Sequence, residues 1–134
     1  MRYERVHIQA IEYVVPPIEV TTASLEQTLQ PLYRRIGVSA GVLQALTGIA
    51  SRRFWPEGTT AADGAAQVAR KLVEKHGVPP CGVQAIVSTS VSKDFLEPPV
   101  ASLVAGDLGL GPGCMNFDVG HACLGFMSGM LTLA

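Results

Sequence analysis

The chain has 134 residues, which is enough for one domain with a hydrophobic core and too few for two. A net charge of −1, with no basic run, gives nucleic acid no support as a partner. Hydrophobic residues make up 48% of the sequence and charged residues only 16%, so we expect much of its surface to be buried against another part of a protein.

Membrane, secreted and metal-binding classes receive no support either. No stretch reaches the roughly 18 uncharged apolar residues that a membrane-spanning helix needs. Residues 1–10 carry Glu4 within an alternating pattern and do not resemble a signal peptide. Three cysteines without CxxC spacing indicate neither a disulfide framework nor a zinc site. These features predict a protein of the reducing cytoplasm without a bound metal.

The first half of the chain predicts a strand, two helices and a second extended segment. Residues 3–15 alternate apolar and other side chains and are rich in β-branched residues, which is typical of a strand. Residues 21–37 begin with threonines, repeat leucine at helical spacing and end on glycine, so they predict a helix; Pro31 would kink it or mark a junction. We expect a short helix within residues 39–48 and a brief extended segment at 49–55.

The second half contains the clearest helix of the sequence. Residues 59–77 have a threonine cap, Asp63 in the first turn, basic residues in the last turn and Gly77 after the end. The elements expected after it are a buried strand within 83–90, a helix at 97–110 with proline in its first turn, a strand at 114–119 and an apolar helix at 124–134.

This alternation of strands and helices predicts an α/β fold built from βαβ units, with a mostly parallel sheet. The final helix, residues 124–134, is apolar on every side, and such a helix must be enclosed on every side. The preceding elements can cover one side of it. We therefore expect the chain to be one half of a larger structure.

Cys123 stands where a glycine-bearing turn enters that apolar helix. A thiol at a helix start lies beside unpaired backbone N–H groups and the positive end of the helix dipole, which favours the thiolate and could bind a developing oxyanion. Gly120 permits a sharp turn before it, and Ala122 and Gly125 leave space for a substrate. A buried structural cysteine is the commoner fate of a free thiol. Position alone leaves both interpretations open.

Three stretches of the chain resemble the β-ketoacyl synthase III branch of the thiolase superfamily. "FDVGHACLGFMSG", residues 117–129, is similar to the active-site motif in which a strand runs into a cysteine at the start of a buried helix. "TGIASRRFW", residues 47–55, is similar to a Thr-Gly-Ile segment with paired arginines. "STSVSKDFLEPPVASLVAGDLGL", residues 88–110, is similar to the strand, loop and helix that precede the nucleophile strand. The resemblance covers essentially the whole chain and implies a layered α-β-α thiolase-like fold with Cys123 as the nucleophile.

The Leu-Glu-Pro step at residues 96–98 resembles the OleA-type enzymes of that branch, which join two fatty acyl-CoA molecules head to head to make olefin precursors. In them, a glutamate at this step reaches across a dimer interface and is held to remove the α-proton of an acyl thioester. The resemblance therefore implies that Glu97 is a general base, whereas the residues alone favour a solvated carboxylate at a helix N-terminus. The implied reaction is a non-decarboxylative Claisen condensation of two fatty acyl-CoAs to a β-ketoacyl product through an acyl-Cys123 intermediate.

Two other functions remain open at this point. A decarboxylative β-ketoacyl-ACP synthase III generates its carbanion from a malonyl group and can do without such a base; simple acyl transfer and thiolytic cleavage are further variants. A non-catalytic half-fold that serves as an interaction module is the third possibility. The presence of Cys123 and Glu97 favours an enzyme, and the length of the chain favours the module.

The second stretch offers candidates for contacting CoA. Arg52 and Arg53 suit phosphate groups, and Trp55 could stack on the adenine; the alternative is a solvated segment. Other residues are interpreted as structural or surface positions: His121, Cys81 and Cys114.

The histidine and asparagine that complete the site in this family come from the second half of the fold. Residues 1–134 are therefore expected to be an N-terminal half-domain that ends inside the nucleophile helix and is inactive alone. The implied partners are the C-terminal half, in the same protein or a separate chain, an acyl-CoA or acyl-carrier-protein substrate, and a second subunit of a homodimer. The resemblance implies no permanently bound cofactor.

Overall fold

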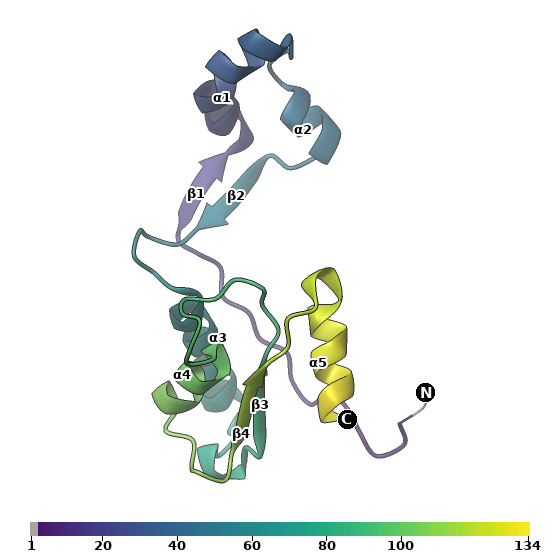
Figure 1. The fold of residues 1–134 in the computed structure, drawn as a ribbon, viewed down its shortest axis with the longest axis vertical. Helices are drawn as coiled ribbons and strands as arrows, with labels where there is room; N and C mark the ends of the chain where they lie inside the picture. Colours follow the sequence, from purple (N-terminus) through teal and green to yellow (C-terminus); the bar gives the residue numbers. More distant parts are fainter. Residues whose placement is uncertain (1–2) are drawn as a thin grey trace. The chain divides into compact units, whose positions relative to one another are not determined.

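The computed structural model describes residues 3–134, which divide into two units (Figure 1). The larger unit consists of residues up to 14 together with residues 59–134, and the smaller unit of residues 15–58. Each unit combines helices with one pair of strands, so the α/β class predicted from the sequence is confirmed.

In the smaller unit, two helices connect the strands of an antiparallel pair. β1 (Ile18–Thr21) pairs with β2 (Ser51–Phe54), and the chain between them forms α1 (Thr22–Ile36) and α2 (Val42–Thr47). β1 ends at Thr21, and after the two helices β2 begins at Ser51, which lies opposite Thr21 in the pair. β2 therefore runs back along β1, unlike the mostly parallel pairing that the sequence predicts. Pro31 lies inside α1.

Two buried polar side chains stabilise the segment between β1 and β2. Thr22 is fully buried, and its hydroxyl donates a hydrogen bond to the carbonyl oxygen of Ile49. The carboxylate of Glu26, also buried, accepts hydrogen bonds from the backbone N–H groups of Gly41 and Leu43 at 2.6 and 2.7 Å. Because Gly41 is the N-cap of α2 and has no side chain to offer, Glu26 supplies the cap from α1.

The larger unit is built around a parallel βαβ unit. Its elements are α3 (Ala61–His76), β3 (Ala85–Ser88), α4 (Val100–Asp107), β4 (Met115–Asp118) and α5 (Gly125–Leu133), with short 3₁₀ turns at Pro80–Gly82 and Ala122–Leu124. β3 and β4 are parallel neighbours, and α4 is the crossover between them. These elements occur where the sequence predicts them, with shorter bounds.

Helices cover β3 on both faces (Figure 1). Ile86 packs against the buried core cluster that Ala62 of α3 forms with Val100 and Val104 of α4. The next residue, Val87, approaches Gly129 of α5 instead. Because successive side chains of a strand point to opposite faces, α3 and α4 form one outer layer and α5 the other. This arrangement confirms the layered α-β-α fold.

The strand predicted within residues 3–15 is wrong. The structure has no strand there, and the first strand is β1. An alternating segment becomes a strand only where a neighbouring strand completes the hydrogen-bonded ladder, and no strand of the described residues pairs with this segment.

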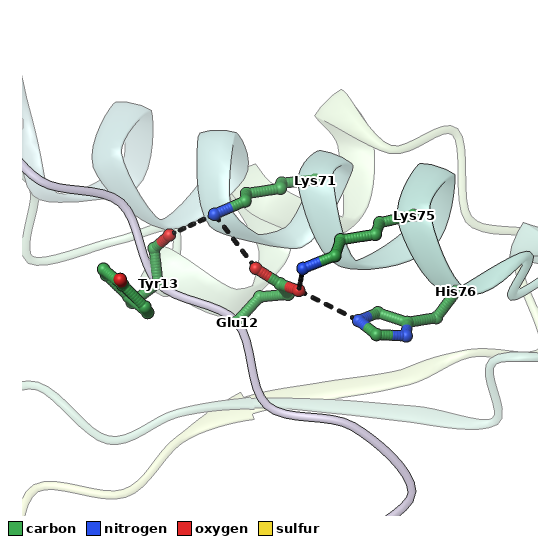
Figure 2. A network of polar contacts seen from close by, with 5 residues as sticks. All are labelled: Glu12, Tyr13, Lys71, Lys75 and His76. Atoms are coloured by element: carbon green, nitrogen blue, oxygen red, sulfur yellow. Dashed lines mark hydrogen bonds and ion pairs between the residues drawn. The ribbon is translucent and has the colours of Figure 1, made fainter.

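The segment is instead bound to α3 through Glu12 (Figure 2). The Glu12 side chain is only 4% exposed, and its carboxylate lies 2.9 Å from Lys71 Nζ, 2.6 Å from Lys75 Nζ and 3.0 Å from His76 Nε2. Lys71 also donates a hydrogen bond to the carbonyl oxygen of Tyr13 at 2.8 Å. Hydrogen bonds from Lys75, Lys71 and His76, in that order of effect, lower the pKa of Glu12 from 4.5 to about 2.

Candidate active site

The two predicted catalytic residues follow neighbouring parallel strands. Ser88 lies opposite Asp118, and the N–H of Val119 donates to the carbonyl oxygen of Ser88 at 2.8 Å, which extends the pairing by one residue. Glu97 lies in the loop after β3, and Cys123 lies in the turn after β4. The carboxyl ends of neighbouring parallel strands are where α/β folds commonly bind their ligands.

Cys123 lies in the 3₁₀ turn that leads directly into α5, and it is exposed. The turn holds Ala122 at a φ of 41°, a left-handed conformation that costs a residue other than glycine about 1–3 kcal/mol. Neither the turn nor α5 begins with a side-chain cap, so no side-chain acceptor covers the start of the helix beside the thiol. His121 Nδ1 lies 2.6 Å from Ser128 Oγ, a contact that links the turn to α5.

Two glycines let α5 approach the end of β3 at backbone distance. A Cβ atom added at Gly125 would lie 2.6 Å from the carbonyl oxygen of Thr89, and one added at Gly129 would lie 2.5 Å from Thr89 Cγ2. Real Cβ atoms essentially never come so close to other heavy atoms. Glycine at both positions therefore sets how close the helix start, and with it Cys123, lies to the sheet.

Glu97 lies in an exposed part of the loop after β3. Phe95 and Leu96, the two residues before it, are exposed apolar side chains, and Leu96 is 91% exposed. Exposed apolar side chains beside an exposed carboxylate are typical of a surface that contacts another protein surface or a ligand.

The loop is anchored by two aspartates that the sequence reasoning missed. Asp94 accepts hydrogen bonds from the N–H groups of Ala61 and Ala62 at the start of α3. Asp118, at the end of β4, does the same for Val100 and Ala101 at the start of α4. A Pro at the N-cap of α4, which offers no side-chain cap, is the one sequence signal that could have indicated a distant acceptor.

The predicted CoA contacts lie in the other unit of the chain. Arg52 donates a hydrogen bond to Thr22 Oγ1 at 3.1 Å, and Arg53 pairs with Glu19 at 3.0 Å. Trp55 follows β2 and is half-buried. The structure therefore does not bring these three residues together with Cys123 and Glu97 in one unit.

The other two cysteines, a metal site and a membrane helix complete the comparison with the sequence-based expectations. Cys114 is buried and Cys81 is exposed. Within residues 3–134, no group of three or more histidine, cysteine, aspartate or glutamate side chains is arranged to hold a metal ion. No helix in the same residues has the length and apolar character needed to cross a membrane.

Comparison with known proteins places this geometry in a family. No protein-family model matches the chain. The acyl-CoA:acyl-CoA alkyltransferase of Shewanella oneidensis is 39% identical over 134 residues, which is 100% of this chain and 38% of that protein. The β-ketoacyl-[acyl-carrier-protein] synthase III of Koribacter versatilis is 30% identical over 128 residues, 96% of this chain and 36% of that protein.

The fold gives the same result. The crystal structure of Xanthomonas campestris OleA with cerulenin bound matches with a TM-score of 0.86 at 38% identity, over 91% of this chain and 36% of the OleA chain. The chain thus spans about 38% of the length of the curated relative from Shewanella oneidensis. In sequence and in fold, it belongs with the N-terminal part of the OleA-type enzymes, within the β-ketoacyl synthase III branch of the thiolase superfamily.

Proposed function

We propose that the protein carrying this chain is an acyltransferase that joins two fatty acyl-CoA molecules by a non-decarboxylative Claisen condensation. The observation that carries this proposal is that Cys123 and Glu97 follow neighbouring parallel strands and are both exposed, so that Cys123 can serve this subunit's site and Glu97 that of a second subunit. The name of the relative from Shewanella oneidensis, acyl-CoA:acyl-CoA alkyltransferase, supports two acyl-CoA molecules as the substrates.

The first half-reaction uses Cys123. Its thiolate attacks the thioester carbonyl of one acyl-CoA, the carbon–sulfur bond to CoA breaks, and the CoA thiolate leaves. The product is an acyl group bound to Cys123 as a thioester. The Cys123 thiol is exposed in the turn that leads into α5, so an acyl-CoA can reach it.

The second half-reaction needs a base, which we assign to Glu97 of a second subunit. The carboxylate takes a proton from the α-carbon of a second acyl-CoA, and the resulting carbanion attacks the carbonyl of the acyl-Cys123 thioester. A carbon–carbon bond forms, the bond from the carbonyl to sulfur breaks, and the Cys123 thiolate is regenerated. The product is a β-ketoacyl-CoA, and no carboxylate is lost at any step.

The remainder of the fold is proposed to complete this site. α5 exposes large apolar side chains that a single water-soluble surface would not favour: Phe126, Met127, Leu131 and Leu133. We propose that the second half of the thiolase-like fold, in the same protein or in a separate chain, covers them and supplies a histidine and an asparagine. Glu97 is then proposed to serve the site of a second subunit in a homodimer, in the cytoplasm, where a reactive thiol stays reduced.

Contacts to CoA at Arg52, Arg53 and Trp55 stay a prediction. Arg53 is the better phosphate ligand, since its side chain is 44% exposed and exposed ion pairs such as that with Glu19 are weak. Arg52 already donates to a buried hydroxyl and is less free to turn towards a ligand.

The match to β-ketoacyl-[acyl-carrier-protein] synthase III favours one second candidate, decarboxylative condensation with a malonyl group. Replacing Glu97 by Gln in the complete enzyme separates the two reactions, because this change keeps the size of the side chain and removes its basicity. We expect acylation of Cys123 by long-chain acyl-CoA to continue and condensation to fall by about 10²–10⁴-fold, which is the usual contribution of a general base.

The measurement follows the acyl-enzyme by mass and the β-ketoacyl product by chromatography in the same samples. Condensation at the parent rate in Glu97→Gln, or product formed only when malonyl-CoA or malonyl-ACP is supplied, would contradict the non-decarboxylative reaction. The absence of any acyl-enzyme and any product in the complete protein would favour the interaction module.

A further inference from the structure

The loop that carries Glu97 is bound to the start of α3 through Asp94. Asp94 lies three residues before Glu97, and its two carboxylate oxygens accept hydrogen bonds from the N–H groups of Ala61 and Ala62 at 2.8 and 2.7 Å. Hydrogen bonds to an ionised carboxylate are shorter and about twice as strong as those between neutral groups. The positive end of the α3 dipole adds to the attraction.

These two hydrogen bonds complete the N-terminal cap of α3, because the residues next to the helix start pair only two of its four free N–H groups. The side chain of Thr60 accepts from the N–H of Asp63 at 3.1 Å, and the N–H of Thr60 donates to the carboxylate of Asp63 at 2.9 Å. Of the four N–H groups that the first turn of a helix leaves unpaired, those of Ala61 and Ala62 remain. Asp94 is their acceptor, so α3 and the loop stabilise one another.

The other side of the loop is held in the same way. The N–H groups of Val100 and Ala101, which begin α4, donate to Asp118 at 3.0 and 2.9 Å. Lys93, the neighbour of Asp94, lies 3.5 Å from the same carboxylate. Glu97 therefore stands three residues after one anchored residue and three residues before the other.

We propose that Asp94 is a positioning residue for Glu97, acting through the loop and not through contact with substrate. This inference rests on the proposed function of Glu97 as the base. A general base must lie within about 2.6–3.2 Å of the proton it removes, and a displacement of about 1 Å can cost about 10²-fold in rate. Without Asp94, the end of the loop before Glu97 keeps only the longer, partly exposed ion pair of Lys93 with Asp118, and Glu97 loses its fixed place on the surface of this subunit.

The test compares Asp94→Ala with a matched control at the same end of α3. Asp63→Ala removes the other carboxylate of this helix start, whose oxygen accepts from the N–H of Thr60 at 2.9 Å, but Asp63 has no bond to the loop. Both variants remove a cap and weaken α3 by about 1 kcal/mol. Only Asp94→Ala releases the loop.

We expect Asp94→Ala in the complete enzyme to lower the condensation rate by about 10- to 100-fold and to change the rate of Cys123 acylation by less than about twofold. Asp94→Asn, whose amide oxygen can still accept one hydrogen bond, should recover part of the loss. Asp63→Ala should leave the ratio of condensation to acylation unchanged. In a Glu97→Gln background, Asp94→Ala should add no further loss, because the base it positions is already absent.

Three results would overturn the positioning role. Asp94→Ala could lower acylation and condensation equally, or its ratio of condensation to acylation could equal that of Asp63→Ala. Asp94→Ala could also lower condensation in the Glu97→Gln background by the same factor as in the parent. Each of them leaves the assignment of Glu97 as the base standing if Glu97→Gln alone is slow. Condensation at the parent rate in Glu97→Gln alone is a different outcome, and it would overturn the proposed function together with this inference.

Discussion

The two faces of β3 are packed in different ways. On the face towards α3 and α4, the contact is made by side chains: Ile86 packs against the small core of Ala62, Val100 and Val104. On the face towards α5, the helix backbone itself comes close, because Gly125 and Gly129 have no side chain to keep it away from β3 and the loop after it. A side chain can turn to another rotamer when a neighbour changes size, whereas a backbone atom cannot.

The face that carries the nucleophile is therefore the face with no room for an added methyl group at two positions of its helix. Cys123 comes two residues before Gly125, so any displacement of the helix start also displaces the thiol. The strained φ at Ala122 lies in the same short turn. The difference between the faces indicates that α3 and α4 provide stability and that the α5 contact provides the position of the thiol.

The largest effect is expected from Gly125→Ala. Its added methyl group would meet the backbone oxygen of Thr89, which no side-chain rotation can remove. We expect a loss of stability of about 3 kcal/mol or more and at least about a tenfold loss in the rate of Cys123 acylation, because the helix start must shift.

Gly129→Ala and Thr89→Ser sharpen the same prediction. The methyl group added at Gly129 would meet Thr89 Cγ2, so Gly129→Ala alone should destabilise the protein by about 1–2 kcal/mol. Thr89→Ser removes that atom, and Gly129→Ala in its background should become neutral or stabilising by up to about 1 kcal/mol, because alanine favours a helix over glycine. Urea denaturation of the four proteins in the complete enzyme measures this.

Val104→Ala is the control on the other face of β3. We expect it to cost about 2 kcal/mol through the cavity it leaves, with the acylation rate of Cys123 unchanged. If Gly129→Ala destabilised equally with and without Thr89→Ser, or if Val104→Ala slowed acylation as strongly as Gly125→Ala, the contrast between the faces would be lost.

The smallest effect is expected on the outer side of α3, where Glu12 holds the N-terminal segment. The pKa of Glu12 is lowered from 4.5 to about 2 by its cationic partners, so its contribution to stability is full above about pH 4.5 and falls as the pH drops towards 2. Glu12→Gln should therefore be less stable than the parent at pH 6, and the difference should shrink at pH 3. A difference in denaturation midpoint that stayed constant over this range would show that the charge of Glu12 contributes nothing.

Features set by neighbouring residues were predictable from the sequence, and features set by distant partners were not. The Thr60–Asp63 capping box and the glycine that ends α3 are local signals, and the helix lies where they indicate. The anchoring of the loop by Asp94 joins residues more than thirty positions apart, and no local pattern reports such a bond. The strand predicted within residues 3–15 failed for the same reason, because its alternation says nothing about whether a partner strand lies beside it.

The candidate site shows the same division. Cys123 and Glu97 could be named from short motifs that resemble a known family, and the order β3, α4, β4 explains why they follow neighbouring parallel strands. The glycines spaced four apart in α5 were visible as small residues, but their partner, Thr89, could be identified only from the packing of the helix on the strand. Which face of a helix meets which strand depends on the whole fold.

Peptide mass analysis of the complete enzyme, after incubation with a long-chain acyl-CoA, shows whether Cys123 is the nucleophile of an acyl transfer. We expect one acyl group on the peptide that contains Cys123, released CoA in equal amount, and neither in a Cys123→Ala variant. An acyl group on the exposed Cys81 instead, or β-ketoacyl product formed by Cys123→Ala at the parent rate, would contradict this role of Cys123.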